Sequence, residues 1–287
     1  MKAFSAAINC IEKKNLIVNR DYEFFLQDIH MDSFESIWRY KNGEIVKHIK
    51  PRSVIRFQIA HQNNNKTIYL KRHNREFVGF WRLFSLFFHR KSLSQGYLEF
   101  ENICEFRNSN LPTVIPIAAG KKFFRFFWAE SFLITEDFYP YISLEALLKD
   151  CPNFFTGQEG KHRKRVLINE ISILAKKMHE NGFNHQDFNA THILLHYDNE
   201  SDVPKLALFD LQRVEKNKIF KLRWKIKSLA RLNYTLPDKI FNKKDRINIL
   251  LFYKGKDRLN FLDQLQWIWI KKKTARIKRH TEKKYQR

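Results

Sequence analysis

Two aspartates in the second half of the chain constrain its fold more than any other feature. Asp187 lies in the run His185-Gln186-Asp187-Phe188-Asn189, after a helical pattern, and Asp210 lies in Leu208-Phe209-Asp210-Leu211, after the pattern of a short hairpin. In phosphoryl transfer from ATP, a loop carboxylate placed like the first accepts or orients the proton of a hydroxyl group. A carboxylate placed like the second holds Mg²⁺ against the phosphates. The spacing therefore predicts Asp187 as the catalytic base and Asp210 as the metal ligand.

The order of the predicted elements favours a chain with two lobes. Residues 36–135 contain short alternating stretches separated by turns, which predict an antiparallel sheet, and a helical pattern over Glu99–Arg107. From Ser143 onward the pattern is helical, with a long helix over Arg165–Glu180 that ends at Asn181-Gly182. We expect an α+β, bilobal protein-kinase-like fold, with an antiparallel-sheet N-lobe that carries one main helix and a mostly helical C-lobe.

The limits of these parts follow from changes in pattern and charge. The expected parts are an N-terminal extension over 1–35, an N-lobe over 36–135, a C-lobe over 136–270 and a basic C-terminal tail over 271–287. An apolar content of 44% is sufficient for a sizeable core. The apolar stretch Phe77–Phe88 is interrupted by Arg82 and is too short to span a bilayer. Its aromatic residues are typical of a membrane interface or of a buried segment, and both interpretations are retained.

A site of this type also needs a cation on the ATP phosphates, fixed by a glutamate on the helix of the first lobe. Lys71 ends a strand pattern and Glu99 begins the predicted helix, so both precede the aspartates in the required order. Glu101 competes with Glu99 for this role. Glu136 to Phe138, in the connector between the lobes, are expected to offer backbone groups to adenine. We therefore expect Lys71, Glu99, Glu136 and Phe138 to bind ATP.

His192 follows Asp187 at the position where protein kinases have an asparagine that binds a second Mg²⁺. Imidazole is a poorer ligand for this hard ion, so either His192 binds the metal weakly or the site relies on Asp210. A zinc site from His192 and His196 is a further alternative, for which the sequence shows no third ligand. His185 is expected to brace the loop through hydrogen bonds.

These segments resemble the lipopolysaccharide kinase family, the Kdo/WaaP group of inner-core sugar kinases, more closely than they resemble protein kinases. The catalytic segment of that family is similar to His-x-Asp-Phe/Leu-Tyr-x-x-His-x-Leu-Leu. This chain matches it at His185, Asp187, Phe188, His192, Leu194 and Leu195. The metal segment of the family, Ile-Asp-Leu-x-Arg, is similar to Phe209-Asp210-Leu211-Gln212-Arg213, whereas Asn189-Ala190-Thr191 replaces the usual Tyr and Cys of the loop.

The resemblance spans about residues 36–260 and implies a specific activity. It implies an ATP- and Mg²⁺-dependent phosphotransferase with an alcohol group as acceptor, namely a heptose or Kdo hydroxyl of the lipopolysaccharide inner core. The expected partners are this glycolipid and the anionic surface of the inner membrane, and the expected location is cytoplasmic and peripheral on that membrane.

The net charge of +23 predicts a polyanionic partner. Eight Lys or Arg lie between Arg213 and Arg231, and nine lie between Lys271 and Arg287, against one Glu in each segment. A solvated face is one interpretation of both clusters. Near an anionic bilayer each such side chain contributes roughly 1 kcal/mol, so the tail is suited to hold the protein there. Nucleic acid is the less favoured partner, although the aromatic and basic residues around Phe220–Arg231 leave RNA as an alternative.

Two alternative functions follow from the same residues. One is a kinase for another acceptor, such as a protein or an aminoglycoside. The other is a catalytically silent kinase-fold module that binds lipid or RNA through its basic surfaces. The complete set of Lys71, Glu99, Asp187 and Asp210 favours catalysis, because binding alone does not require it.

Overall fold

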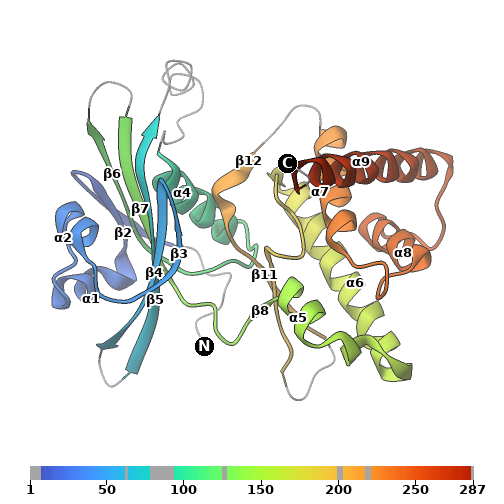
Figure 1. Cartoon of the computed structure of the whole chain (residues 1–287), viewed down its shortest axis with the longest axis horizontal. Helices are drawn as coiled ribbons and strands as arrows, with labels where there is room; N and C mark the ends of the chain where they lie inside the picture. The colour runs from blue at the N-terminus through green and yellow to red at the C-terminus, as the bar shows by residue number, and fades with distance from the viewer. Residues whose placement is uncertain are drawn as a thin grey trace. The chain divides into compact units, whose positions relative to one another are not determined.

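The computed structural model describes residues 8–61, 64–77, 94–124, 128–198, 203–216 and 221–285 (Figure 1). The chain forms two compact units that divide between Phe138 and Tyr139. Apart from Phe77, the aromatic segment Phe77–Phe88 lies outside the described residues. Within the described part of the chain, none of the helices has the length and apolarity that crossing a membrane requires.

The first unit is built on a seven-stranded antiparallel sheet with the order β1-β2-β6-β7-β5-β4-β3. The strands are β1 (Cys10–Lys13), β2 (Leu16–Asn19), β3 (Glu44–Ile49), β4 (Arg52–His61), β5 (Asn64–Phe77), β6 (Pro116–Phe124) and β7 (Trp128–Glu136). The alternating stretches predicted within residues 36–135 include 54–59 and 67–71, which lie in β4 and β5 and pair with Val54 opposite Lys71. A turn at Lys50-Pro51 joins β3 to β4.

Residues 8–35, which belong to the segment that the sequence pattern set apart as an extension, contribute strands and core to this unit. β1 and β2 extend the sheet, and η1 (Arg20–Tyr22), α1 (Glu23–Asp28) and α2 (Phe34–Arg39) follow β2. Tyr22, Phe25 and Leu26 are buried in one apolar cluster with strand residues such as Leu70 and Ile134. The first unit therefore begins before residue 36.

The main helix of the first unit is α4 (Gln95–Asn108), which covers the helix predicted at Glu99–Arg107 and begins earlier. Phe100, Ile103 and Phe106 are buried at the predicted helical spacing. A Cβ at Gly96 would lie 2.7 Å from the backbone of Phe132, so only glycine lets the first turn of α4 approach β7 this closely. This close packing places the side chains of α4 beside the central strands of the sheet.

The second unit is mostly helical, as predicted. Its helices are α5 (Leu144–Asp150), η2 (Pro152–Phe155), α6 (Gly157–Glu180), η3 (Leu211–Arg213), α7 (Lys221–Thr235), α8 (Lys243–Lys254) and α9 (Phe261–Tyr285). Two small sheets complete it: β8 (Ile142–Ser143), β10 (Ile193–His196) and β11 (Lys205–Leu208) form one, and β9 (Phe183–His185) pairs with β12 (Val214–Lys216) in the other. The predicted hairpin between the two aspartates is β10–β11, with Ile193 opposite Leu208.

Local signals explain most helix ends in this unit. The hydroxyl of Ser143 accepts a hydrogen bond from the N–H of Ala146 and caps α5, where the helical pattern was predicted to begin. Gly182, with a φ of 82°, follows the end of α6 at the predicted place. The basic residues expected as a separate tail over 271–287 continue α9 as far as Tyr285, because Lys and Arg are good helix formers and no breaker interrupts them.

Candidate active site

In the first unit, Lys71 and Glu99 form a buried ion pair. The Nζ atom of Lys71, on β5, lies 2.5 Å from Oε2 of Glu99, on α4, and the two residues are 8% and 4% exposed. Glu101 is two residues further along α4 and therefore points to a nearly opposite side of the helix. There its charge acts on Tyr97 and Lys121. Lys71 thus takes Glu99, rather than Glu101, as its carboxylate partner.

The connector residues predicted to meet adenine are already hydrogen-bonded within the first unit. The N–H of Glu136 donates to the carbonyl of Ile115 (2.9 Å), and its carboxylate accepts from Tyr22 (2.6 Å) and Lys66 (2.7 Å). Burial and the bond to Glu136 raise the pKa of Tyr22.

Phe138 uses its backbone differently from Glu136. Its N–H donates to the side chain of Asp137 (2.8 Å), and its ring stacks on Tyr69 with the ring centres 5.9 Å apart. A bond to an adjacent side chain can be exchanged for a bond to a ligand without disrupting the sheet. Of the two predicted connector residues, Phe138 thus has the more available N–H.

In the second unit, two arginines hold the carboxylate of Asp187. The Nη1 atom of Arg213 lies 2.9 Å from Oδ2 of Asp187, and Arg231 bonds the other carboxylate oxygen, Oδ1. The pairing of β9 with β12 brings Arg213 to this place, because Val214 lies opposite His185 and the N–H of Gln186 donates to the carbonyl of Arg213. The carboxylate is thereby fixed in position and 18% exposed.

Helix α7 fixes the loop around Asp187 through one of its faces. Ser228, Arg231 and Thr235 recur at spacings of three and four residues, which place them on the same side of the helix. Ser228 donates to Asn184 (2.9 Å) before the loop, and Thr235 accepts from the N–H of Ala190 (3.0 Å) after Asp187. None of these three residues was predicted from the sequence. The only local signal was the position of Arg231 at the end of a basic cluster, which is typical of solvated faces as well.

His185 braces the loop through both ring nitrogens, as expected. Its Nδ1 accepts from the N–H of Asp187 (3.1 Å), and its Nε2 donates to the carbonyl of Phe209 (3.3 Å). Burial, together with the proximity of His192, lowers the pKa of His185 to about 4. The ring is therefore neutral at pH 7, and it links the loop of Asp187 to the segment before Asp210.

His192 and Asp210 present two potential metal ligands to each other. The Nδ1 atom of His192 donates to the carbonyl of Asp187 (2.9 Å), which leaves its Nε2 as an acceptor that faces Oδ2 of Asp210 at 3.8 Å. Asp210 adopts a left-handed conformation (φ 55°, ψ 58°), which Asp tolerates better than most residues. Two ligands at this separation can bind one cation.

The zinc alternative has less support in the structure. In the described ranges no group of three or more His, Cys, Asp or Glu side chains is placed to hold a metal. His196 is 2.9 Å from Asp198, at the far end of β10 from His192. A cation between His192 and Asp210 would thus find no third His, Cys, Asp or Glu ligand among the described residues.

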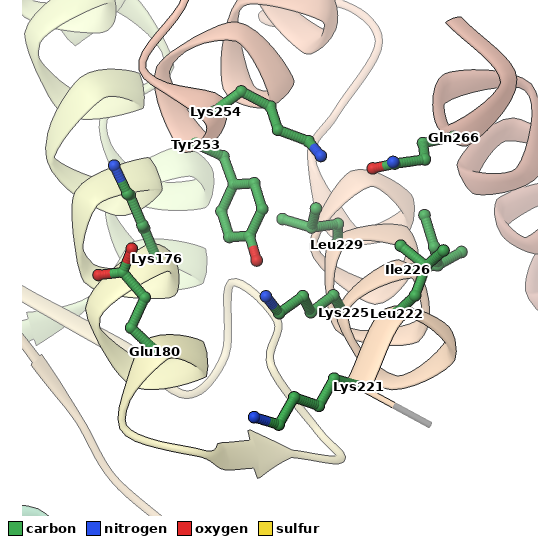
Figure 2. A pocket seen from close by; sticks show the side chains of 10 residues that line it. All are labelled: Lys176, Glu180, Lys221, Leu222, Lys225, Ile226, Leu229, Tyr253, Lys254 and Gln266. Carbon is green, nitrogen blue, oxygen red and sulfur yellow. The ribbon is translucent and has the colours of Figure 1, made fainter. Parts of the chain in front are cut away.

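A cavity of about 360 Å³ lies among α6, α7, α8 and α9 of the second unit (Figure 2). Four lysines, from α6, α7 and α8, surround Leu222, Ile226, Leu229 and Tyr253: Lys176, Lys221, Lys225 and Lys254. Figure 2 shows Tyr253 and Lys225 pointing toward each other across this cavity. None of the residues that line it was predicted for the active site.

The comparison with known proteins decides the family. A model of the lipopolysaccharide kinase (Kdo/WaaP) family matches residues 36–253, which is most of the chain. This protein belongs to that family. The resemblance inferred from the catalytic and metal segments is therefore confirmed.

Two Escherichia coli proteins of the lipopolysaccharide kinase family are similar to this chain over nearly their whole length. The lipopolysaccharide core heptose(I) kinase WaaP of Escherichia coli is 26% identical over 270 residues, covering 88% of this chain and 97% of that protein. WaaP from another Escherichia coli strain is 27% identical over 261 residues, covering 88% and 94%.

A solved structure from the same family confirms the predicted fold. The structure of WaaP in complex with acyl carrier protein matches with a TM-score of 0.68 at 20% identity, and the match covers 91% of this chain and 98% of that chain. The α+β, kinase-like architecture with a sheet-based first part and a helical second part is thus confirmed.

Proposed function

We propose that this protein is an ATP- and Mg²⁺-dependent kinase that phosphorylates a heptose hydroxyl of the lipopolysaccharide inner core. The observation that carries the proposal is the arrangement in the second unit, where a fixed carboxylate, Asp187, is hydrogen-bonded through its own backbone to the histidine that faces Asp210. Heptose is preferred to Kdo because the two Escherichia coli relatives are heptose(I) kinases.

Asp187 would orient the acceptor hydroxyl and accept its proton. Because phosphoryl transfer proceeds through a loose transition state, position matters more for this carboxylate than high basicity does. Arg213 and Arg231 hold it in one position. Arg213 is 54% exposed, so its guanidinium group is also accessible to phosphate oxygens on the donor or the acceptor.

Asp210 and His192 would hold Mg²⁺, which neutralises charge on the ATP phosphates. The donor atoms suit this ion, because Mg²⁺ commonly takes only one or two protein ligands and fills its octahedral shell with phosphate oxygens and water. Asp210 provides the hard oxygen ligand. His192 provides a nitrogen ligand whose orientation is fixed by its bond to the carbonyl of Asp187.

Lys71 would neutralise the phosphates of ATP from the first unit, with Glu99 fixing its position. Phe138 would bind adenine through its N–H, after this group releases the side chain of Asp137. Glu136 would contribute through its remaining backbone groups, because its own N–H is bonded to Ile115. The reaction would take place at the cytoplasmic face of the inner membrane, with the protein bound there peripherally.

The test is transfer of labelled γ-phosphate from ATP to two purified glycolipids, one with inner-core heptose and one that ends at Kdo. Label on the heptose-containing acceptor alone would support the proposal. Label on the Kdo-only acceptor would mean that Kdo is the phosphorylated sugar. ATP binding without label on either glycolipid would indicate another acceptor. Failure to bind Mg²⁺-ATP would contradict the proposal and favour a catalytically silent binding module.

A further inference from the structure

The outer face of α9 exposes more apolar surface than a solvated helix normally does. Its first turns expose five large apolar side chains, each between 42% and 71% accessible: Phe261, Leu262, Leu265, Ile268 and Trp269. Spacings of three, four and seven residues place them on one face of the helix. These five residues are called the apolar stripe below.

Among the described residues, the fold covers the apolar stripe only in part. α9 already packs against α7 in the second unit (Figure 1), and its other face makes this contact. On that face Ile270 is buried, and Oγ1 of Thr274 accepts a hydrogen bond from Asn233 (3.1 Å) of α7. Asp263 is also buried there and pairs with Lys256 at 2.7 Å. The stripe is thus a second apolar face on a helix that is already anchored.

A basic groove of about 580 Å³ continues the same side of α9 toward its C-terminal end. Six cationic side chains from α7 and α9 line it: Arg223, Lys227, Lys272, Lys273, Arg276 and Arg279. Trp224 and Trp269 also line it, and no acidic residue is among its lining residues. Trp269 belongs to both the groove and the apolar stripe, so the two features are continuous.

The cations of the basic groove repel one another. Burial, followed by the charges of Arg231, Arg213 and Lys273, lowers the pKa of Lys227. The ammonium group of Lys227 lies 4.8 Å from the ring centre of Trp224. Six cations and no acidic residue line this groove, so it is suited to bind phosphate groups.

We propose that the apolar stripe and the basic groove together form a docking surface for an anionic phospholipid bilayer. The stripe would enter the boundary between headgroups and acyl chains, Trp269 would lie at the interface, and the groove would bind lipid phosphates. RNA or an acidic soluble protein would match the charge of the basic groove, but neither would account for the exposed apolar stripe.

Docking through α9 would connect the membrane to the loop of Asp187 by way of α7. α9 is hydrogen-bonded to α7 through Thr274, and α7 holds the loop through Ser228 and Arg231. A bilayer on the outer face of α9 is thus connected to Asp187 through two packed helices of one unit. This placement suits an acceptor sugar that is anchored in the same bilayer, and in this respect the inference rests on the proposed function.

The experiment measures binding of the full-length protein to vesicles by flotation. Vesicles of phosphatidylglycerol and phosphatidylcholine in equal parts should bind the protein, and vesicles of phosphatidylcholine alone should bind it far more weakly. Replacing Phe261, Leu262 and Leu265 by Ser should weaken partitioning by about 100-fold, because the stripe loses its apolar area. The variant Lys272→Gln/Arg276→Gln should lose about 30-fold.

A matched control separates this surface from a general effect of charge. Lys271→Gln/Lys278→Gln removes the same charge from exposed positions of the same helix that do not line the groove, and it should change partitioning little. A bilayer lipid carrying bromine should quench the fluorescence of Trp269, and Trp269→Phe should lose that part of the quenching. Each variant should melt as the unmodified protein does, because the replaced side chains are exposed or partly exposed.

Three results would overturn the proposal. The first is no binding to phosphatidylglycerol vesicles, including the case in which the protein binds RNA or an acidic protein instead. The second is an equal loss in the control pair, and the third is full binding by the serine variant. Vesicle binding should persist in Asp187→Asn, so a failure of docking and a failure of the proposed catalysis can be distinguished.

Discussion

The buried ion pair of Lys71 and Glu99 makes a quantitative prediction. Lys71→Met would leave the carboxylate of Glu99 in a place where the residue is only 4% exposed, without its cation. Removing one partner of a buried ion pair typically costs about 3–5 kcal/mol, because the other charge stays desolvated and unpaired. Glu99→Gln would remove the carboxylate charge that faces the Lys71 ammonium in the same buried place. The double variant Lys71→Met/Glu99→Gln removes both charges and should be more stable than the sum of the single variants predicts.

Urea denaturation of the four proteins gives the coupling free energy directly. We expect a coupling of about 2 kcal/mol or more between the two positions. At roughly 2–4 °C per kcal/mol, Lys71→Met should lower the melting temperature by about 10 °C, and the double variant should recover part of this loss. Glu101→Gln is the matched control, because the same change on the other side of α4 should show no coupling with Lys71→Met.

Phosphate transfer by the same variants separates the structural role of the ion pair from the role of Lys71 toward ATP. The double variant should recover stability but not phosphate transfer, because no cation is left for the ATP phosphates. Additive effects of the two single changes on stability would refute the ion pair. Transfer at the unmodified rate by the double variant would refute the role of Lys71 toward ATP.

Three further predictions concern the second unit. Arg231→Gln should lower kcat by about 10- to 100-fold with a smaller change in the KM for ATP, because Asp187 loses a guanidinium group that fixes its position; equal changes in kcat and KM would argue against positioning. His192→Ala should raise the Mg²⁺ concentration needed for half-maximal activity, whereas an unchanged Mg²⁺ titration would leave Asp210 as the only protein ligand. The unfolding free energy should be constant above pH 6.5 and fall by a few kcal/mol as the pH drops toward 4. Burial lowers the pKa of His185 to about 4 and that of His179 to about 3, so the unfolded chain binds protons at a higher pH than the folded protein does. His179→Gln should flatten this dependence, and a curve that keeps its full slope in that variant would contradict the assignment.

The fold could be predicted where its signals are local. Alternation in β4 and β5, the helical spacing of Phe100, Ile103 and Phe106, and the cap at Ser143 each lie within a few residues of one another. The contribution of residues 8–35 could not be predicted in the same way. β2 is held by β6, which follows about a hundred residues later in the chain, and four-residue strands give too short an alternation to identify.

The same distinction applies to the candidate site. Asp187, His192 and Asp210 lie in short segments with a recognisable spacing, and the structure places His192 facing Asp210. The contact between Arg231 and Asp187 spans 44 residues and depends on how α7 packs against the loop. No spacing rule connects two such positions, so the sequence identified Arg231 only as one cation in a basic cluster.

The most direct test of the account is phosphate transfer by Asp187→Asn under conditions in which Mg²⁺-ATP binding is measured on the same sample. The change replaces one carboxylate oxygen by an NH2 group and keeps the size of the side chain. We predict that transfer to the heptose-containing acceptor falls by about 1,000-fold, while the affinity for Mg²⁺-ATP stays within a few-fold of the unmodified protein. Transfer at close to the unmodified rate would contradict the central claim that Asp187 acts on the acceptor hydroxyl.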